Sequence, residues 1–354
     1  MINNDTSVLN SLKVSKIILP IAIGLAVIGW MIYKQTDLNE LQKIPYNAAT
    51  FFWLGIAIFM YVLRHLFYAW RLRIMTDYEF SWPKAIQLIF IWEFSSAVSP
   101  TSVGGAGVAF FLLAKEKLSG AKTISVVLYS MVVDTLFFVI SLPLLYFILG
   151  AIMIRPGMNL LSDIDGYGVT FLTVLVLMIG YGGVFFYGLF VNPNTIRKLV
   201  LWISKIPFLI KFKPELEETA EEVVITAKTM KTKTMDFHLK AGATTAGAWI
   251  TRFFAINCLI MAFVSNVDLS ILDNLIILGR GEAMHVITSF SPTPGAAGIA
   301  EFLFGGFFSE YIPLGIAALI ALVWRLISYY TYLVAGAIII PIWYRGVTSA
   351  KNRK

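Results

Sequence analysis

The sequence predicts an all-α integral membrane protein, with six spanning helices and two opposed re-entrant helical hairpins in an inverted repeat. Three observations lead to this prediction: the composition, a series of long apolar runs, and a Pro/Gly-rich phrase that occurs twice. Of the 354 residues, 58% are hydrophobic and 14% are charged, and the mean hydropathy is +0.77. A soluble domain carries about 25% charged residues. We therefore expect a single polytopic membrane domain over residues 1–354.

Six apolar runs are long enough to cross a bilayer, which takes about 20 residues in a helix. They cover residues 17–33, 50–70, 121–153, 166–191, 239–265 and 313–345. The third and the last run are the longest, and each contains or adjoins a proline, at Pro143, Pro313 and Pro341. We expect these two helices to tilt, to kink or to extend past the membrane surface.

Two segments between the spans, 82–117 and 269–310, have a different pattern. Each consists of two short apolar arms around a Ser-Pro, Gly-rich centre: "SPTSVGGAGVAF" at 99–110 and "SPTPGAAGIAE" at 291–301. An arm of about 15 residues rises only about 23 Å as a helix, which is less than the about 30 Å thickness of the hydrocarbon core. Each segment therefore predicts a re-entrant hairpin that enters and leaves the membrane by the same face.

Basic residues indicate the orientation of the chain. The 192–240 segment holds nine Lys and Arg residues, which predicts a cytoplasmic loop. Counting spans outward from this loop assigns both termini, and the segment that carries Arg71, to the cytoplasmic side, and leaves only Lys34, Lys43 and Arg155 outside. The net charge of +7 thus follows membrane topology and does not indicate a nucleic-acid partner. Within the loop we expect an interfacial helix followed by a solvated one.

The two Gly-rich phrases define the repeat. With Gly104 aligned to Gly295, Gly107 meets Gly298 and Asp134 meets Arg325. The repeat units are then 50–153 and 239–345, and the span 166–191 between them inverts the second unit. The tips of the hairpins should meet near the midplane.

Broken helices at membrane depth are tolerated only when protein buries them or when they line a cavity. Their free backbone N–H groups and glycines suit an anion. This predicts a substrate-binding role for the residues of the two tips, which are Ser99, Gly104, Gly105, Ser291, Gly295 and Gly298.

Charged residues inside the apolar segments are costly unless they are paired or hydrated. They are Arg64, Arg252, Arg280, Arg325, Glu93, Asp134, Glu282 and Glu301. Four cations and four anions can pair completely as internal salt bridges, and that structural role is one interpretation, above all for Asp134 and Arg325. For Arg64, snorkelling to the cytoplasmic surface is the favoured interpretation.

The other interpretation of these charges is functional. Guanidinium groups bind phosphate in a bidentate manner, so Arg280 and Arg325 are predicted substrate ligands. Carboxylates shielded from water titrate nearer neutral pH, which makes them candidates for gating or proton coupling. The predicted set for that role is Glu93, Asp134, Glu282, His285 and Glu301; for His285 a packing role is the alternative.

Motifs of soluble enzymes are missing from the sequence. It contains no Walker loop, no GxSxG, no HExxH and no CxxC, and "GGAG" follows no strand. One cysteine, Cys258, and three histidines argue against a disulfide framework and a zinc site. We expect neither a cofactor nor a metal, and no enzymatic activity.

The phrases "SPTSVGGAGVAFFLLAKE" and "SPTPGAAGIAEFLF" resemble those of the lysylphosphatidylglycerol synthase transmembrane-region family, also called the flippase-like family. The second phrase carries the resemblance at Pro294, Gly298, Glu301 and the later Arg325. The resemblance implies a bacterial inner-membrane protein that moves a lipid between leaflets. Full-length synthases of this kind carry a soluble transferase domain after the membrane region. This sequence ends at "YRGVTSAKNRK", so we expect no synthase activity.

These observations together predict a lipid flippase or transporter. Its substrate would be an anionic or aminoacylated phospholipid, or a lipid-linked phosphate intermediate, with the head group at the hairpin tips. The alternatives are a secondary transporter of a soluble anion, a membrane enzyme acting on a lipid-linked substrate, and a non-transporting scaffold.

Overall fold

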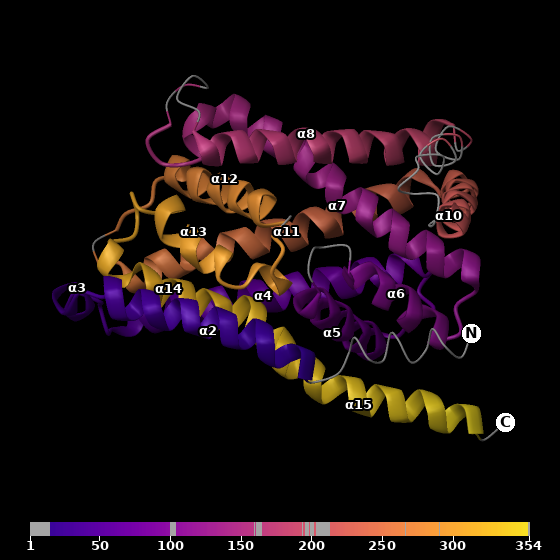
Figure 1. The fold of residues 1–354 in the computed structure, drawn as a ribbon, viewed down its shortest axis with the longest axis horizontal. Helices are drawn as coiled ribbons and strands as arrows, with labels where there is room; N and C mark the ends of the chain where they lie inside the picture. Colours follow the sequence, from indigo (N-terminus) through magenta and orange to yellow (C-terminus); the bar gives the residue numbers. More distant parts are fainter. Residues whose placement is uncertain are drawn as a thin grey trace.

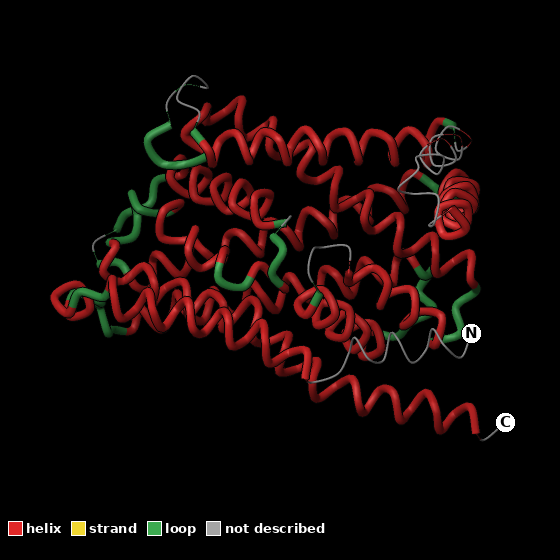
Figure 2. Tube along the Cα trace, viewed as in Figure 1, coloured by secondary structure: helices red, strands yellow, loops and turns green. Residues whose placement is uncertain are grey.

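The computed structural model describes residues 15–352, apart from 100–103, 159, 161–164, 193, 195–197, 199–201, 203–212, 266 and 290. The described residues form helices joined by turns and loops, with no strand among them (Figure 2). The helices are α2 (Ser15–Gln35), α3 (Leu38–Gln42), α4 (Ala48–Met75), α5 (Trp82–Val98), α6 (Gly104–Lys115), α7 (Gly120–Leu149), η1 (Gly150–Met153), α8 (Gly166–Phe186), η3 (Tyr187–Val191), α10 (Lys213–Lys231), α11 (Met235–Phe263), α12 (Ile271–Thr288), η5 (Pro294–Ala296), α13 (Ile299–Phe307), α14 (Leu314–Arg325), η6 (Leu326–Tyr330) and α15 (Thr331–Asn352).

Four helical stretches in the described part of the chain are long and apolar enough to cross a membrane. They are Ala48–Met75, Gly120–Met153, Met235–Phe263 and Leu314–Val347. They agree with four of the six predicted spans. The remaining two predicted spans coincide with α2 and with α8 plus η3, and their passage through the membrane stays a prediction.

Local chemistry sets the limits of the long helices. The side chains of Asn47, Ser119 and Thr234 accept hydrogen bonds from the first free N–H groups of α4, α7 and α11. α7 ends where Gly150 takes φ +73, a conformation that suits glycine. The last long helix is interrupted by the π-turn η6 and contains Pro341, both common causes of helix bending.

The most extensive helix packing in the described structure joins the two repeat units. It forms between α4 and α11, which lie side by side through the centre of Figure 1. A Cβ at Gly247 of α11 would come within 2.8 Å of the Phe67 ring of α4, so only glycine allows this approach. The predicted units 50–153 and 239–345 therefore meet along their first helices.

The predicted loop 192–240 is described mainly through α10. The predicted interfacial helix lies largely outside the described residues. α10 packs on α7 and η3, and it buries Thr226, Ala227 and Met230. Our prediction of a fully solvated helix is therefore wrong for one of its faces. In Figure 1, α10 lies at the same end of the molecule as the start of α7 and the end of α15.

The two predicted hairpin segments each contain two short helices, α5 with α6 and α12 with α13. The first tip, at 100–103, lies outside the described residues. The turn between α12 and α13 lies in the middle of the molecule, away from both ends (Figure 2). A Cβ on Gly24, halfway along α2, would be 3.7 Å from Ala297. η5 contacts α5, so the second break lies beside the first hairpin segment.

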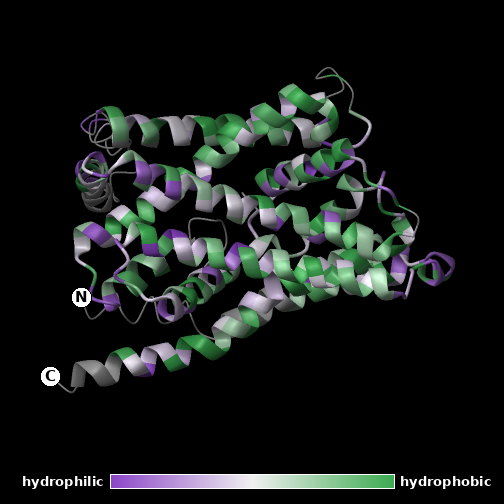
Figure 3. Ribbon diagram, turned by 180° about the vertical axis from the view of Figure 1, so that it is seen from behind, coloured by the Kyte–Doolittle hydropathy of each residue, from purple (hydrophilic) through white to green (hydrophobic). Residues whose placement is uncertain are grey.

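Hydrophobic residues make up much of the length of the helices (Figure 3), and many large ones are exposed. Large exposed examples are Phe51, Phe147, Ile148, Val334 and Ile338. A soluble protein does not expose so much apolar surface. Hydrocarbon is the surrounding that suits this surface, and the hydrophilic residues in Figure 3 gather at the ends of the helices and at a few places inside.

Candidate functional site

Two hydrophobic cores divide the molecule along the helix axes. One core takes α5, α6, the beginning of α7 and the beginning of α11. The other takes the end of α7, the rest of α11, and α12 to α14. Charged side chains from both units lie near the boundary. We call this set the polar layer; it consists of Arg64, Arg71, Glu93, Asp134, Arg252, Glu301 and Arg325.

In the second unit, Glu301 and Arg325 of the polar layer bind each other and the turn between α12 and α13. The Nε of Arg325 donates to Oε1 of Glu301 at 2.7 Å, and a terminal nitrogen donates to the Gly295 carbonyl at 3.0 Å. The other carboxylate oxygen of Glu301 accepts from the Gly298 backbone N–H at 2.7 Å, which caps α13. The Glu301 side chain is 0% exposed and that of Arg325 is 6% exposed. These groups hold the turn in one conformation.

Tyr329 connects this turn to the first hairpin segment. Its hydroxyl donates to the Ala97 carbonyl at the end of α5, at 3.1 Å, and the centre of its ring lies 4.0 Å from the Arg325 guanidinium carbon. Gly295 adopts φ +58 against the same ring, and a Cβ there would come within 2.2 Å of it. The two units are therefore in contact at the middle of the molecule.

In the first unit the layer is more open. A terminal nitrogen of Arg64 donates to Glu93 at 2.6 Å and another donates to the Tyr332 hydroxyl at 2.8 Å. The Arg64 side chain is 3% exposed and that of Glu93 is 23% exposed. The expectation that Arg64 snorkels to the surface is wrong, because Glu93, Tyr332 and the ring of Tyr68 surround it inside the protein.

A second ion pair of the first unit joins α4 to α7. Both terminal nitrogens of Arg71 donate to the carboxylate of Asp134, at 2.6 and 3.1 Å. The indole of Trp249 adds a hydrogen bond to Asp134 at 2.9 Å, and Thr245 accepts one from Arg71. Arg71, which the span count assigns to a cytoplasmic segment, is therefore buried between α4, α7 and α11. Asp134 and Arg325 occupy corresponding places in the repeat, yet each pairs with a residue of its own unit.

Complete pairing among the charges of the apolar segments is also wrong. Only Arg64–Glu93 and Arg325–Glu301 pair within that set. Arg280 pairs instead with Glu310 at 2.7 Å and also donates to the Ile152 and Phe307 carbonyls. The Arg280 side chain is 0% exposed, so this geometry favours a structural role at one end of the second core.

Glu282 and His285 lie in α12 without an ionic partner among the described residues. Glu282 accepts a hydrogen bond from Ser141 at 2.6 Å, and its other carboxylate oxygen is buried without a partner. His285 stacks against Phe138 and lies near the Trp249 ring. Both therefore face α7 or α11 and stay candidates for the predicted coupling role.

The structure describes the predicted serines and glycines of the two hairpin tips to different extents. Ser291 shares a hydrogen bond with Thr293 at 2.9 Å and stabilises the approach to the turn. Ser99 ends α5 in an extended conformation. Gly104 and Gly105 begin α6, directly after the tip that lies outside the described residues. The structure thus brings together Gly295, Gly298, Glu301 and Arg325 around the central turn. Arg280 pairs elsewhere, with Glu310.

Six residues that the sequence reasoning does not assign to the site belong to the polar layer or contact it. They are Arg64, Arg71, Arg252, Trp249, Tyr329 and Tyr332. The signal for the arginines is their position in apolar helices. No comparable signal marks the aromatic residues, because tryptophan and tyrosine are frequent in membrane helices.

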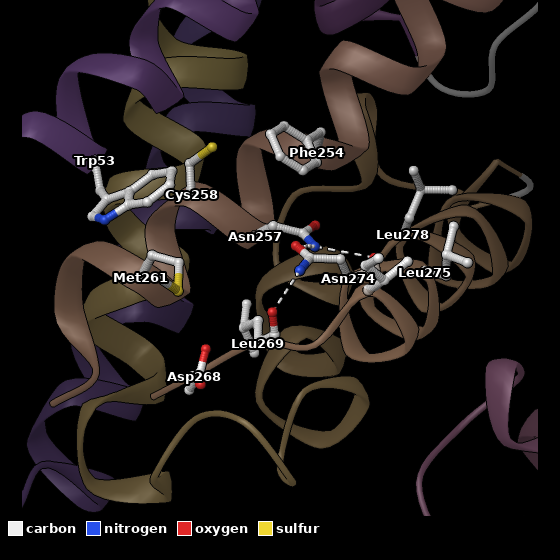
Figure 4. A pocket seen from close by; sticks show the side chains of 11 residues that line it. Trp53, Phe254, Asn257, Cys258, Met261, Asp268, Leu269, Asn274, Leu275 and Leu278 are labelled. Carbon is white, nitrogen blue, oxygen red and sulfur yellow. Dashed lines mark hydrogen bonds between the residues drawn. The ribbon is translucent and has the colours of Figure 1, made fainter. Parts of the chain in front are cut away.

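A cleft of about 410 Å³ lies between α4, α11 and α12, toward the end where α11 finishes (Figure 4). Its lining is mostly apolar, with Trp53, Phe254 and Leu278 as examples. The polar groups are an amide pair, in which Asn257 donates to Asn274 at 2.8 Å, and Asp268. Within the described part of the chain, no three His, Cys, Asp or Glu side chains are grouped to hold a metal ion.

The fold and the polar layer define the class of protein: a multi-pass helical membrane protein with ion pairs buried between its helices. The model of the family described as the lysylphosphatidylglycerol synthase TM region matches residues 17–336, so the chain belongs to this family. A similar protein is a UPF0104 membrane protein of Archaeoglobus fulgidus, which is 23% identical over 331 residues. The match covers 90% of this chain and 94% of the archaeal protein.

Proposed function

We propose that this protein is a lipid flippase that moves an anionic or aminoacylated phospholipid, or a lipid-linked phosphate, between the leaflets of a cell membrane. The proposal includes a bacterial inner membrane, both termini on the cytoplasmic side, and no enzymatic step. Family membership supports a lipid-related membrane role, because the family takes its description from the membrane region of a phospholipid-modifying synthase.

The observation that carries the proposal is the polar layer between two apolar cores. A lipid head group that crosses a bilayer must pass the middle of the hydrocarbon, where polar groups are scarce and charges are costly. Both units contribute charged side chains to the polar layer, and the Glu93 side chain is 23% exposed; in this proposal the polar layer lies at that depth. Acyl chains would stay in lipid while the head group exchanges with these charges.

The division of labour in this proposal follows the geometry. The central turn is held by Arg325, Glu301, Gly295 and Gly298. The head group binds at the charged side chains of the first unit, Arg64 and Glu93. Glu282 and His285 on α12 are the proposed proton-coupling groups. The apolar cleft beside Trp53 and Phe254 favours a lipid over a soluble anion, because its lining suits an acyl chain better than an ion.

Reconstitution into liposomes tests the proposal. Fluorescently labelled phosphatidylglycerol, lysyl-phosphatidylglycerol, phosphatidylcholine and a polyprenyl phosphate are placed in both leaflets, and a membrane-impermeant reductant quenches the outer label. The protein should let the quenching proceed to the inner label, at rates that depend on the head group. The Glu93→Gln variant should be slower, whereas Glu79→Gln, at an exposed surface pair, should match the wild type.

Two outcomes contradict the proposal. One is a lack of head-group-dependent flipping across this panel with folded protein. The other is uptake of labelled inorganic phosphate without lipid movement, which would make the protein a carrier of a soluble anion.

A further inference from the structure

Arg252 stands apart among the buried arginines of the polar layer. It lies in α11, and its guanidinium carbon is 5.1 Å from the centre of the Trp249 ring. Every other arginine of the layer has a carboxylate within 2.7 Å. Arg252 makes no ion pair and no hydrogen bond through its side chain to any residue that the structure describes.

The charges around Arg252 leave one positive charge in excess. Its electrostatic neighbours are Arg64 and Glu93 of the first unit and His285 of α12. Glu93 is already bonded to Arg64. Two arginines therefore share a single carboxylate. The Nε of Arg64 is also buried without a hydrogen-bond partner.

A cation without an ionic partner inside an apolar helix is energetically unfavourable. Arg252 and Glu93 are both partly exposed, so an ion or head group can reach them without disrupting the core. On one side Arg252 lies beside the Trp249 ring, which itself packs against the rings of Phe138 and His285. The arrangement therefore offers a positively charged, partly exposed site to an anion.

We propose that Arg252, with the free Nε of Arg64, binds the phosphodiester group of a phospholipid between α4 and α11. This inference rests on the proposed function and gives it a substrate class. A phosphodiester carries one negative charge and so cancels the excess, and its two free oxygens match the forked donors of a guanidinium. Glu93, which faces both arginines, is the internal anion that the phosphate partly displaces.

Direct binding to the purified full-length protein tests this site. The probe is dioctanoyl phosphatidylglycerol, titrated in detergent and followed by native mass spectrometry or calorimetry. Arg252→Gln should weaken binding by about ten- to a hundredfold, which corresponds to the loss of a charge-assisted hydrogen bond. Arg252→Lys, which keeps the charge but loses the fork, should fall in between. Arg155→Gln removes the arginine of a surface pair with Asp165 and should bind like the wild type.

Two further ligands identify the source of the phosphate. Dioctanoyl glycerol, which lacks phosphate, should bind equally to wild type and Arg252→Gln. Inorganic phosphate should bind much more weakly than the lipid. If phosphate alone binds as tightly as phosphatidylglycerol, the lipid head group is the wrong ligand.

Thermal unfolding without added anionic lipid separates a binding role from a structural one. If Arg252 has a binding role, Arg252→Gln removes a charge that has no ionic partner in the protein, and the unfolding midpoint should stay equal or rise. A lowered midpoint together with unchanged lipid affinity would overturn the inference and make Arg252 structural.

The two proposals fail separately. Wild-type flipping with unchanged lipid binding by Arg252→Gln removes this site and leaves the proposed function. Lipid binding that depends on Arg252, without any flipping, supports the site and removes the proposed function.

Discussion

The two repeat units stabilise their buried Glu–Arg pairs in different ways. Each buries a Glu–Arg pair at the middle of the molecule, Glu93 with Arg64 in the first and Glu301 with Arg325 in the second. In the second unit both carboxylate oxygens and two guanidinium nitrogens bind protein groups, and Glu301 is sealed from solvent. In the first, a single bond joins the carboxylate to the arginine, and Glu93 is 23% exposed.

This difference indicates that the second-unit pair has a structural role and that the first-unit pair is accessible to a ligand. A saturated, fully buried ion pair is costly to open, because each partner would be left as an unpaired charge. A partly exposed pair with an unused donor and a second arginine nearby can exchange partners at lower cost. The Glu301–Arg325 pair therefore holds the turn in place, whereas the Arg64–Glu93 pair, with Arg252 of α11 beside it, presents the charges.

The largest expected effect comes from breaking the closed pair. Glu301→Gln leaves Arg325 buried without its carboxylate and should lower the free energy of unfolding by about 3–5 kcal/mol. Glu93→Gln should cost less, about 1–3 kcal/mol, because water reaches that carboxylate. Thermal unfolding with and without dioctanoyl phosphatidylglycerol measures both, and only Glu93→Gln should regain stability on adding the anionic lipid. Equal losses without recovery would remove the contrast between the units.

The next effect concerns the central turn. Gly295→Ala puts a Cβ at φ +58 within 2.2 Å of the Tyr329 ring, and it should cost about 2 kcal/mol or more. Gly107→Ala in the first unit serves as the control, because a Cβ there meets nothing within 4 Å. In the helix α6 that change should be neutral or stabilise by up to about 1 kcal/mol. Unfolding midpoints of the two variants decide the matter, and a tolerated Gly295→Ala would contradict the tight packing of Tyr329 on the turn.

The smallest effect lies outside the membrane, in the turn after α4. Burial raises the pKa of Asp77, but hydrogen bonds from Lys233 and Lys122 lower it more, so that the pKa lies below its ordinary value. A carboxyl group with a lowered pKa stabilises the folded state above its unfolded pKa. This stabilisation is lost as the pH falls through the folded pKa.

Asp77→Asn should therefore lower stability at pH 7 by about 0.5 kcal/mol, because the half-exposed group is screened by solvent. The difference from the wild type should vanish in acid, below the lowered pKa. Unfolding midpoints at pH 7, 5 and 3 measure this, and a difference that grows as the pH falls would show that the ion pairs of Asp77 are not its cause.

Much of the fold follows from local sequence features. Runs of apolar residues about 20 long define helices on length alone, and four of the predicted spans are found as long apolar helices. Proline and glycine mark the breaks in 82–117 and 269–310, since these residues end helices wherever they lie. The motif residues Gly298, Glu301 and Arg325 point to the family to which the chain belongs.

Charge partners do not follow from the sequence. The alignment of the repeats puts Asp134 opposite Arg325, but the ion pairs form within units, with Arg71 and with Glu301. The span count assigns Arg71 to a cytoplasmic segment. Only the packing of α4 against α11 and α7 shows that its side chain is buried.

Hydropathy and repeat spacing thus determined by themselves that this chain is a helical membrane protein with two broken segments, because apolar length and backbone breaks are local properties. Only the tertiary structure decided which charges pair, which one is left over, and where the two units touch. The physical reason is that an ion pair depends on distances of a few ångströms between helices far apart in the chain, and such distances arise from packing.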